Sequence, residues 1–215
     1  MSIPSVVPEQ WTAADADRFN FEPYLEATAI VDWERHLVAH LARKLALNAY
    51  STLAVAKRCF HFVRDDIKHA SDHAIKPIAC RASEVLILRA GLCYSKSHLL
   101  AALLRANGIP AGFCYQRLRL VPDQDRYALH GFNACYLPRY GWYRLDARGN
   151  KEGIDARFDP PTERLAFRPE GPGEMTDRRI WMEPLDLVVK ALRSHASHDE
   201  LCLALPDADL AGVGN

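Results

Sequence analysis

The stretch RAGLCYSKSHLLAALLRANGIPAG, residues 89–112, decides the fold. Its leucines recur at helical spacing and predict a buried helix over Cys93–Asn107. The residues Gly108-Ile109-Pro110 end that helix, because glycine commonly follows a helix and proline cannot continue one. A cysteine, Cys93, therefore stands at the first turn of the predicted helix.

The position of Cys93 leaves two interpretations open. The free N–H groups and the dipole of a helix N-terminus favour a thiolate, so a cysteine placed there is suited to be a nucleophile. Cysteine is also among the most buried residue types, and position alone favours a packing role in the core. A nucleophilic cysteine needs a base, and the base needs a group that orients it.

The chain after this helix changes to a strand pattern. Side chains alternate in character over Leu129–Leu137, and a turn at 138–141 joins this segment to Trp142–Ala147. The two segments predict an antiparallel hairpin, and Ala111–Leu120 predicts a strand that precedes it. Helices come first and strands follow, which indicates an α+β fold rather than alternating βαβ units.

The remaining segments complete a single domain, since 215 residues fall near the usual size of one domain. The helical pattern is continuous from Glu26 to Cys59, and a second helix is predicted from Ser51, as N-cap, to Ile67. We further expect a surface arm at 1–25, a loop at 69–82, a short helix at 83–90 capped by Ser83, strands at 164–168 and 178–182, a helix at 184–195 and a flexible tail at 206–215.

His130 and Asp146 could serve Cys93 as base and orienting acid, in the chain order Cys, His, Asp. Their positions on the hairpin make this pairing testable, because side chains alternate between the faces of a sheet. If the loop holds three residues, 138–140, Asp146 pairs with Phe132 and lies diagonal to His130. A loop with an even number of residues would put the two on opposite faces.

Two segments, GLCYSKSHLLAALLRANGIPAG and LHGFNACYLPRYGWYRLDARG, resemble the transglutaminase-like superfamily. The shared features are Gly-x-Cys opening an apolar helix that ends at Gly-Ile-Pro, a histidine-aromatic strand, and a Gly-Trp hairpin that leads to Leu-Asp. The resemblance covers about residues 63–150 and implies a papain-like α+β fold. It implies a triad in which Cys93 is the nucleophile, His130 the base and Asp146 the orienting acid.

The resemblance implies acyl transfer through a thioester on Cys93, with a peptide or small amide as substrate. Hydrolysis is the expected outcome; transfer onto a small amine and a non-catalytic scaffold that kept the fold are the alternatives. The oxyanion would be held by the Cys93 N–H and a second donor, for which His69 and Tyr94 are candidates.

Three departures from the family pattern concern the shape of the pocket and hence the substrate. Gly131-Phe132 stands where Ala-Trp is usual, Ala147-Arg148 where Pro-Thr is common, and Leu92 where a polar residue is frequent.

Composition bears on the partners and on the compartment. Basic and acidic residues both number 27, which argues against a nucleic-acid or anionic-membrane partner. The start lacks the pattern of a secretory signal, and no run reaches the roughly 18 apolar residues of a membrane span, so we expect a cytoplasmic protein with reduced thiols. The other five cysteines, Cys59, Cys80, Cys114, Cys135 and Cys202, are interpreted as packing thiols, with Cys114 and Cys135 able to face each other across strands.

Metal and cofactor sites are not expected. His69 and His73 have a metal-like spacing only if their segment is helical, which its lack of periodicity disfavours, and no third ligand is evident. The chain is too short for the calcium-binding domains of larger relatives, so calcium dependence is not implied. His98 and Trp142 are interpreted as packing residues.

Overall fold

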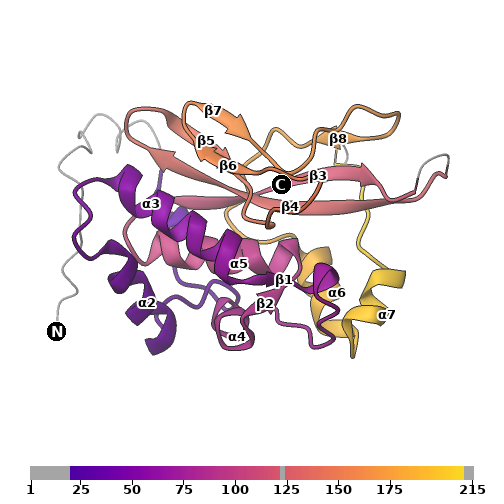
Figure 1. Cartoon of the computed structure of the whole chain (residues 1–215), viewed down its shortest axis with the longest axis horizontal. Helices are drawn as coiled ribbons and strands as arrows, with labels where there is room; N and C mark the ends of the chain where they lie inside the picture. The colour runs from indigo at the N-terminus through magenta and orange to yellow at the C-terminus, as the bar shows by residue number, and fades with distance from the viewer. Residues whose placement is uncertain (1–19, 122–123, 211–215) are drawn as a thin grey trace.

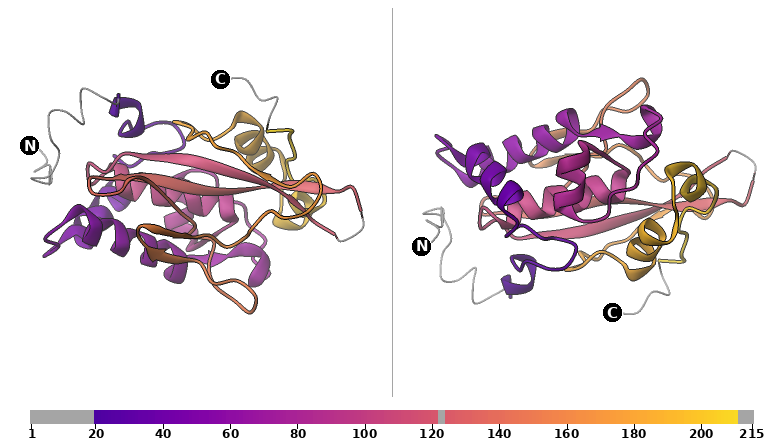
Figure 2. Two further views of the ribbon diagram at one scale, coloured as in Figure 1. Left: turned by 90° about the horizontal axis from the view of Figure 1, so that it is seen from above. Right: turned by 90° about the horizontal axis from the view of Figure 1, so that it is seen from below.

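The computed structural model describes residues 20–121 and 124–210 and has an α+β fold (Figure 1). A four-stranded sheet in the order β5-β4-β3-β8 forms one layer, and the helices α2 to α5 form the other. Helix α5 lies between the sheet and α4 (Figures 1 and 2). The helices are η1 (Glu22–Tyr24), α2 (His36–Ala46), α3 (Thr52–His61), the π-helix η2 (Phe62–Asp66), η3 (Ala70–Asp72), α4 (Ala82–Leu88), α5 (Cys93–Arg105), α6 (Asp186–Ser194) and α7 (His198–Leu203). The strands are β1 (Lys68–His69), β2 (Ala90–Gly91), β3 (Ala111–Arg119), β4 (Tyr127–Leu137), β5 (Gly141–Leu145), β6 (Arg157–Asp159), β7 (Thr162–Arg164) and β8 (Met175–Thr176).

Helix α5 is the centre of the core, and it begins at Cys93 as predicted. All of its residues from Tyr94 to Arg105 are buried. The turn that follows contains Gly108 with a φ of 69°, a conformation that glycine adopts without strain. The buried helix therefore fixes where its N-terminus lies against the sheet.

The hairpin between β4 and β5 has the register that the pairing of His130 with Asp146 requires. Leu137 pairs with Gly141, so the loop holds three residues. Strand β5 ends at Leu145, opposite Asn133, and Asp146 follows immediately. Strand β4 continues beyond the end of β5, so His130 lies where β4 no longer has β5 beside it.

The first helical prediction was too long at both ends, since α2 ends at Ala46 and α3 begins at Thr52. Helix α2 begins at His36, because Thr28 forms a turn in which its Oγ1 accepts the N–H of Val31 at 3.1 Å. Ile30 is nevertheless buried, which explains the continuous apolar pattern. The short helix α4 was also capped differently: Ser83 donates its hydroxyl to Asp32 instead of capping.

The strands predicted at 164–168 and 178–182 are mostly irregular chain in the structure. Residues 165–168 follow β7 as irregular chain, and from 178–182 only Trp181 forms a bridge, to Phe113 of β3. Cys114 pairs with Phe132 rather than with Cys135, so these two cysteines do not face each other. All six cysteines are free thiols.

Both ends of the described chain pack against the domain, contrary to the predicted arm and tail. Phe21 is buried, and its ring lies 4.5 Å from that of Tyr136. Pro206 accepts the N–H of Leu129 at 2.8 Å, and Asp207 receives two hydrogen bonds from Arg117 at 2.7 Å. Apolar burial and charge pairing thus hold these segments; residues 1–19 and 211–215 lie outside the described residues.

Within residues 20–121 and 124–210, none of the helices combines the length and apolar character needed to span a bilayer.

Candidate active site

The N-terminus of α5 approaches β4 very closely at Gly131. A Cβ atom on Gly131 would lie 2.9 Å from Cδ1 of Tyr94, which is too close without a shift of the ring. The hydroxyl of Tyr94 donates to the carbonyl of Leu129 and fixes the ring in place. Glycine at this position, one of the departures from the family pattern, therefore lets Cys93 approach His130.

The structure brings the three predicted residues together. Nε2 of His130 donates to Oδ2 of Asp146 at 2.7 Å, and both side chains are buried. The half-buried thiol of Cys93 lies beside the imidazole, since its interaction with the ring contributes to the raised pKa of His130. Because Asp146 occupies Nε2, Nδ1 is the nitrogen left for the sulfur.

Electrostatics make His130 and Asp146 a buried ion pair. Burial alone would lower the pKa of His130, but the charge of Asp146, its hydrogen bond and the contact with Cys93 raise that pKa to about 10. Burial alone would raise the pKa of Asp146, but the charge and hydrogen bond of His130 and two backbone N–H groups keep it below its usual value. His130 therefore keeps its proton at neutral pH and can deliver it to a leaving group.

Two backbone N–H groups orient the carboxylate of Asp146. Ala166 donates to Oδ2 and Arg148 to Oδ1, each at 3.0 Å. The ring of Phe167 lies edge-on to His130, with centroids 4.9 Å apart. The loop after β7 therefore covers the His130–Asp146 pair; no motif or periodicity in the sequence marks this loop.

Of the two candidates for the second oxyanion donor, His69 remains available. Tyr94 has its hydroxyl bonded to Leu129 within the core. His69 pairs with Gly91, two residues before Cys93, and its buried Nδ1 has no hydrogen-bond partner. Burial first and the charge of Arg148 second lower the pKa of His69 to about 3, so its imidazole is neutral at pH 7.

The remaining candidates lie outside this cluster. His98 is fully buried and contacts the carbonyl of Cys80 at 2.7 Å, so its predicted packing role is confirmed. His73 follows η3 rather than lying one helical turn from His69. Across the described part of the chain, no three His, Cys, Asp or Glu side chains are grouped as metal ligands.

Comparisons with known proteins identify the family of this chain. A family model described as the Transglutaminase-like superfamily matches residues 39–147, about half of the chain, a span that includes Cys93, His130 and Asp146. No curated protein matches the chain.

Solved structures with a similar fold include a candidate cysteine protease from Cytophaga hutchinsonii, with 18% identity, a TM-score of 0.49 and coverage of 68% of this chain and 45% of that one. The periplasmic domain of TgpA from Pseudomonas aeruginosa is 19% identical, with a TM-score of 0.44 and coverage of 58% of this chain and 45% of that one. This chain thus spans less than half of the length of either protein.

Proposed function

Because this chain belongs to the transglutaminase-like superfamily, we propose that it is a cysteine enzyme that forms a thioester between Cys93 and the acyl group of an amide. One observation carries the proposal: the His130–Asp146 pair, 2.7 Å apart, is buried beside the Cys93 thiol, whose interaction with the imidazole contributes to the raised pKa of His130. Moving a charged group from water into the protein interior costs roughly several kcal/mol per ion, and the attraction between the two ions must offset this cost. A scaffold protein has no need of such a pair beside a half-buried thiol.

The reaction follows from these contacts. The Cys93 thiolate attacks the amide carbonyl and a C–S bond forms, while the carbonyl oxygen takes the negative charge. His130 gives its proton to the leaving nitrogen, and the C–N bond breaks. Water then attacks the thioester, His130 takes a proton from it, and the acid leaves as the Cys93 sulfur departs.

The oxyanion would be held by the backbone N–H of Cys93 and by His69. No side chain caps the first turn of α5, since Leu92 occupies the N-cap position, so the N–H groups there are not taken by a cap. His69 would serve as a neutral imidazole, through the ring nitrogen that carries the proton. Removal of one hydrogen-bond donor to the oxyanion typically lowers the reaction rate by about 10²- to 10³-fold.

We propose a peptide or small amide as the substrate, with water rather than an amine as the acceptor. The test uses p-nitrophenyl acetate as a general acyl donor, with acid quench and mass spectrometry of the intact protein and its peptides. We expect an acetyl group on Cys93 of the wild type and none on Cys93→Ala. Added amines should leave acetate as the main product; a dominant amide product would favour the acyltransferase instead, and no adduct on Cys93 would refute the proposal.

Amide cleavage is expected to fall as the pH rises through about 10, the pKa of His130. Above that pH the imidazole has lost the proton that the leaving nitrogen needs. The measurement is the pH dependence of p-nitroaniline release from an acyl p-nitroanilide in single turnover. Acylation by p-nitrophenyl acetate is the control, because its phenolate leaves without a proton; an anilide profile with no fall up to pH 11 would contradict the assignment.

A further inference from the structure

The site has two halves that come from different parts of the fold. His130 and Asp146 belong to the β4–β5 hairpin, whereas Cys93 and His69 belong to α5 and to the short β1–β2 pair. Beyond the contact of Cys93 with His130, a buried arginine, Arg148, joins these halves. It occupies a position where the family pattern commonly has threonine, which could not make the same connection.

Arg148 contacts the two halves with different groups. Its backbone N–H donates to Oδ1 of the catalytic carboxylate of Asp146 at 3.0 Å. Its guanidinium forms a two-pronged contact with Asp72, in which Nη1 bonds Oδ2 and Nη2 bonds Oδ1 at 2.9 Å. Arg148 is only 7% exposed, so water screens this pair little.

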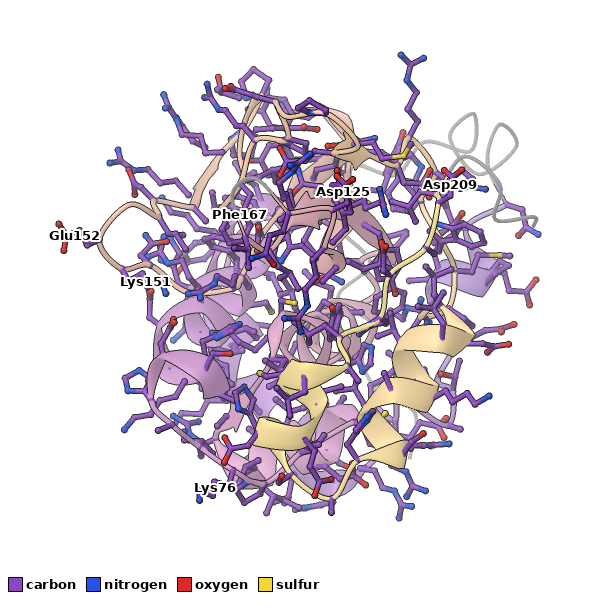
Figure 3. The ribbon with its side chains drawn as sticks, turned by 90° about the vertical axis from the view of Figure 1, so that its right-hand side faces the viewer. Lys76, Asp125, Lys151, Glu152, Phe167 and Asp209 are labelled. Atoms are coloured by element: carbon purple, nitrogen blue, oxygen red, sulfur yellow. The ribbon has the colours of Figure 1, made fainter. Side chains whose placement is uncertain are left out.

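Asp72 in turn lies beside His69. It is the last residue of η3, three positions after His69, and its Oδ2 is 3.9 Å from Nδ1 of that histidine. Burial alone would raise the pKa of Asp72, but hydrogen bonds from Arg148 and Lys151 hold it well below its usual value, so the carboxylate stays charged. Lys151 reaches Oδ1 at 2.8 Å from a projecting loop (Figure 3).

The segment that carries His69 is held on its other side by a buried lysine of α5. Nζ of Lys96 donates to the carbonyls of Arg64, at 3.2 Å, and of Ile67. The segment 64–72 is thus attached to the catalytic helix by Lys96 and to the Asp146 loop by Arg148. Of these two attachments, the one through Arg148 bonds directly to Asp146.

We propose that the Arg148–Asp72 pair is a clamp that positions Asp146 and the His69 segment for acyl transfer, without touching the substrate. The inference rests on the proposed function. A bidentate pair fixes both distance and orientation, which a lysine cannot do with its single ammonium group. Displacement of a catalytic group by about 1 Å can cost on the order of 10²-fold in rate.

The test compares Arg148→Met, Arg148→Lys, Asp72→Asn and the Arg148→Met/Asp72→Asn double variant. We expect kcat for an acyl p-nitroanilide, per enzyme molecule titrated at Cys93, to drop about 10- to 100-fold in the single variants while KM stays close to that of the wild type. Lysine should not restore the rate. The double variant should be no slower than either single variant, because the two residues act as one unit.

A second readout separates positioning from ordinary stabilisation. With Asp146 less firmly held, the fall of the anilide pH profile should move below the wild-type value of about 10. Arg157→Met is the matched control, because it breaks an exposed arginine–aspartate pair, with Asp155, outside the site. It should leave kcat and the pH profile unchanged.

The outcomes are distinct for the two proposals. If the wild type forms no adduct on Cys93, the proposed function fails and this inference fails with it. If the wild type is acylated and folded Arg148→Met and Asp72→Asn retain its kcat and pH profile, only the clamp is refuted. Should Arg148→Met not fold, Asp72→Asn, which keeps the shape of the side chain, decides between these outcomes.

Discussion

Cys93→Ser is expected to abolish thioester formation and to lower amide cleavage by about 10⁴- to 10⁶-fold, the range seen when a catalytic nucleophile is removed. The hydroxyl is similar in size to the thiol, so the fold and the His130–Asp146 contact should persist. However, a serine hydroxyl holds its proton far more tightly than a thiol does, so it is a much weaker nucleophile near neutral pH. The loss therefore reports chemistry rather than packing.

The measurement is single-turnover release of p-nitroaniline together with the mass of the acid-quenched protein. Cys202→Ser is the matched control, since Cys202 is the other thiol that is only half-buried and it also lies near a histidine, His198, at 3.3 Å. We expect this control to react like the wild type. Turnover by Cys93→Ser at the wild-type rate would show that the nucleophile lies elsewhere.

Asp146→Asn is expected to lower amide cleavage by about 10³- to 10⁴-fold, because loss of the orienting carboxylate leaves the histidine in the wrong protonation or tautomeric state. The charge of Asp146 is what raises the pKa of His130 against burial. An uncharged amide removes that effect, so the fall in the anilide pH profile should move to lower pH. The N–H groups of Ala166 and Arg148 would also lose a charged acceptor.

The same substitution should reduce the free energy of unfolding by about 3–5 kcal/mol, as expected when one member of a buried ion pair is removed. The stability from His130 is fully present below its unfolded pKa of 6.5 and fades as the pH rises to about 10. The stability from Asp146 is present above its unfolded pKa of 3.8 and is lost at lower pH. The difference from the wild type should therefore be greatest between about pH 4 and 6.5.

Urea unfolding of wild type and Asp146→Asn at pH 5.5, 7.5 and 9.5 measures this difference. Asp155→Asn serves as the control, because Asp155 pairs with Arg157 at the surface. A stability difference that does not change with pH, together with unchanged cleavage, would contradict the ion pair described here.

The hairpin and the start of α5 could be predicted from the sequence because local rules determine them. The three-residue loop puts Asp146 and His130 on the same face of the sheet. The glycine and proline after Asn107 end the helix that begins at Cys93. The grouping of Cys93, His130 and Asp146 was therefore predicted from the family resemblance, and the three-residue loop meets the condition that loop parity set. Their roles as a catalytic triad stay a prediction.

Local sequence patterns could not predict the loop that covers the His130–Asp146 pair or the Arg148–Asp72 clamp. Phe167 and Ala166 lie on an irregular loop that contacts the triad only through tertiary packing. Arg148 and Asp72 are 76 positions apart, and neither has a periodic pattern around it that would link them. The packing of Pro206, whose carbonyl accepts the N–H of Leu129, is likewise marked by no local pattern.

The central claim, that His130 and Asp146 activate Cys93, is tested most directly by the rate at which each cysteine of the native protein reacts with iodoacetamide at neutral pH. Peptide mass spectrometry follows the six cysteines separately, and the unfolded protein supplies the rate of a free thiol. We expect Cys93 to react first and faster than a free thiol, while the buried Cys59, Cys80, Cys114 and Cys135 are protected. Alkylation of Cys93 no faster than a free thiol would contradict it.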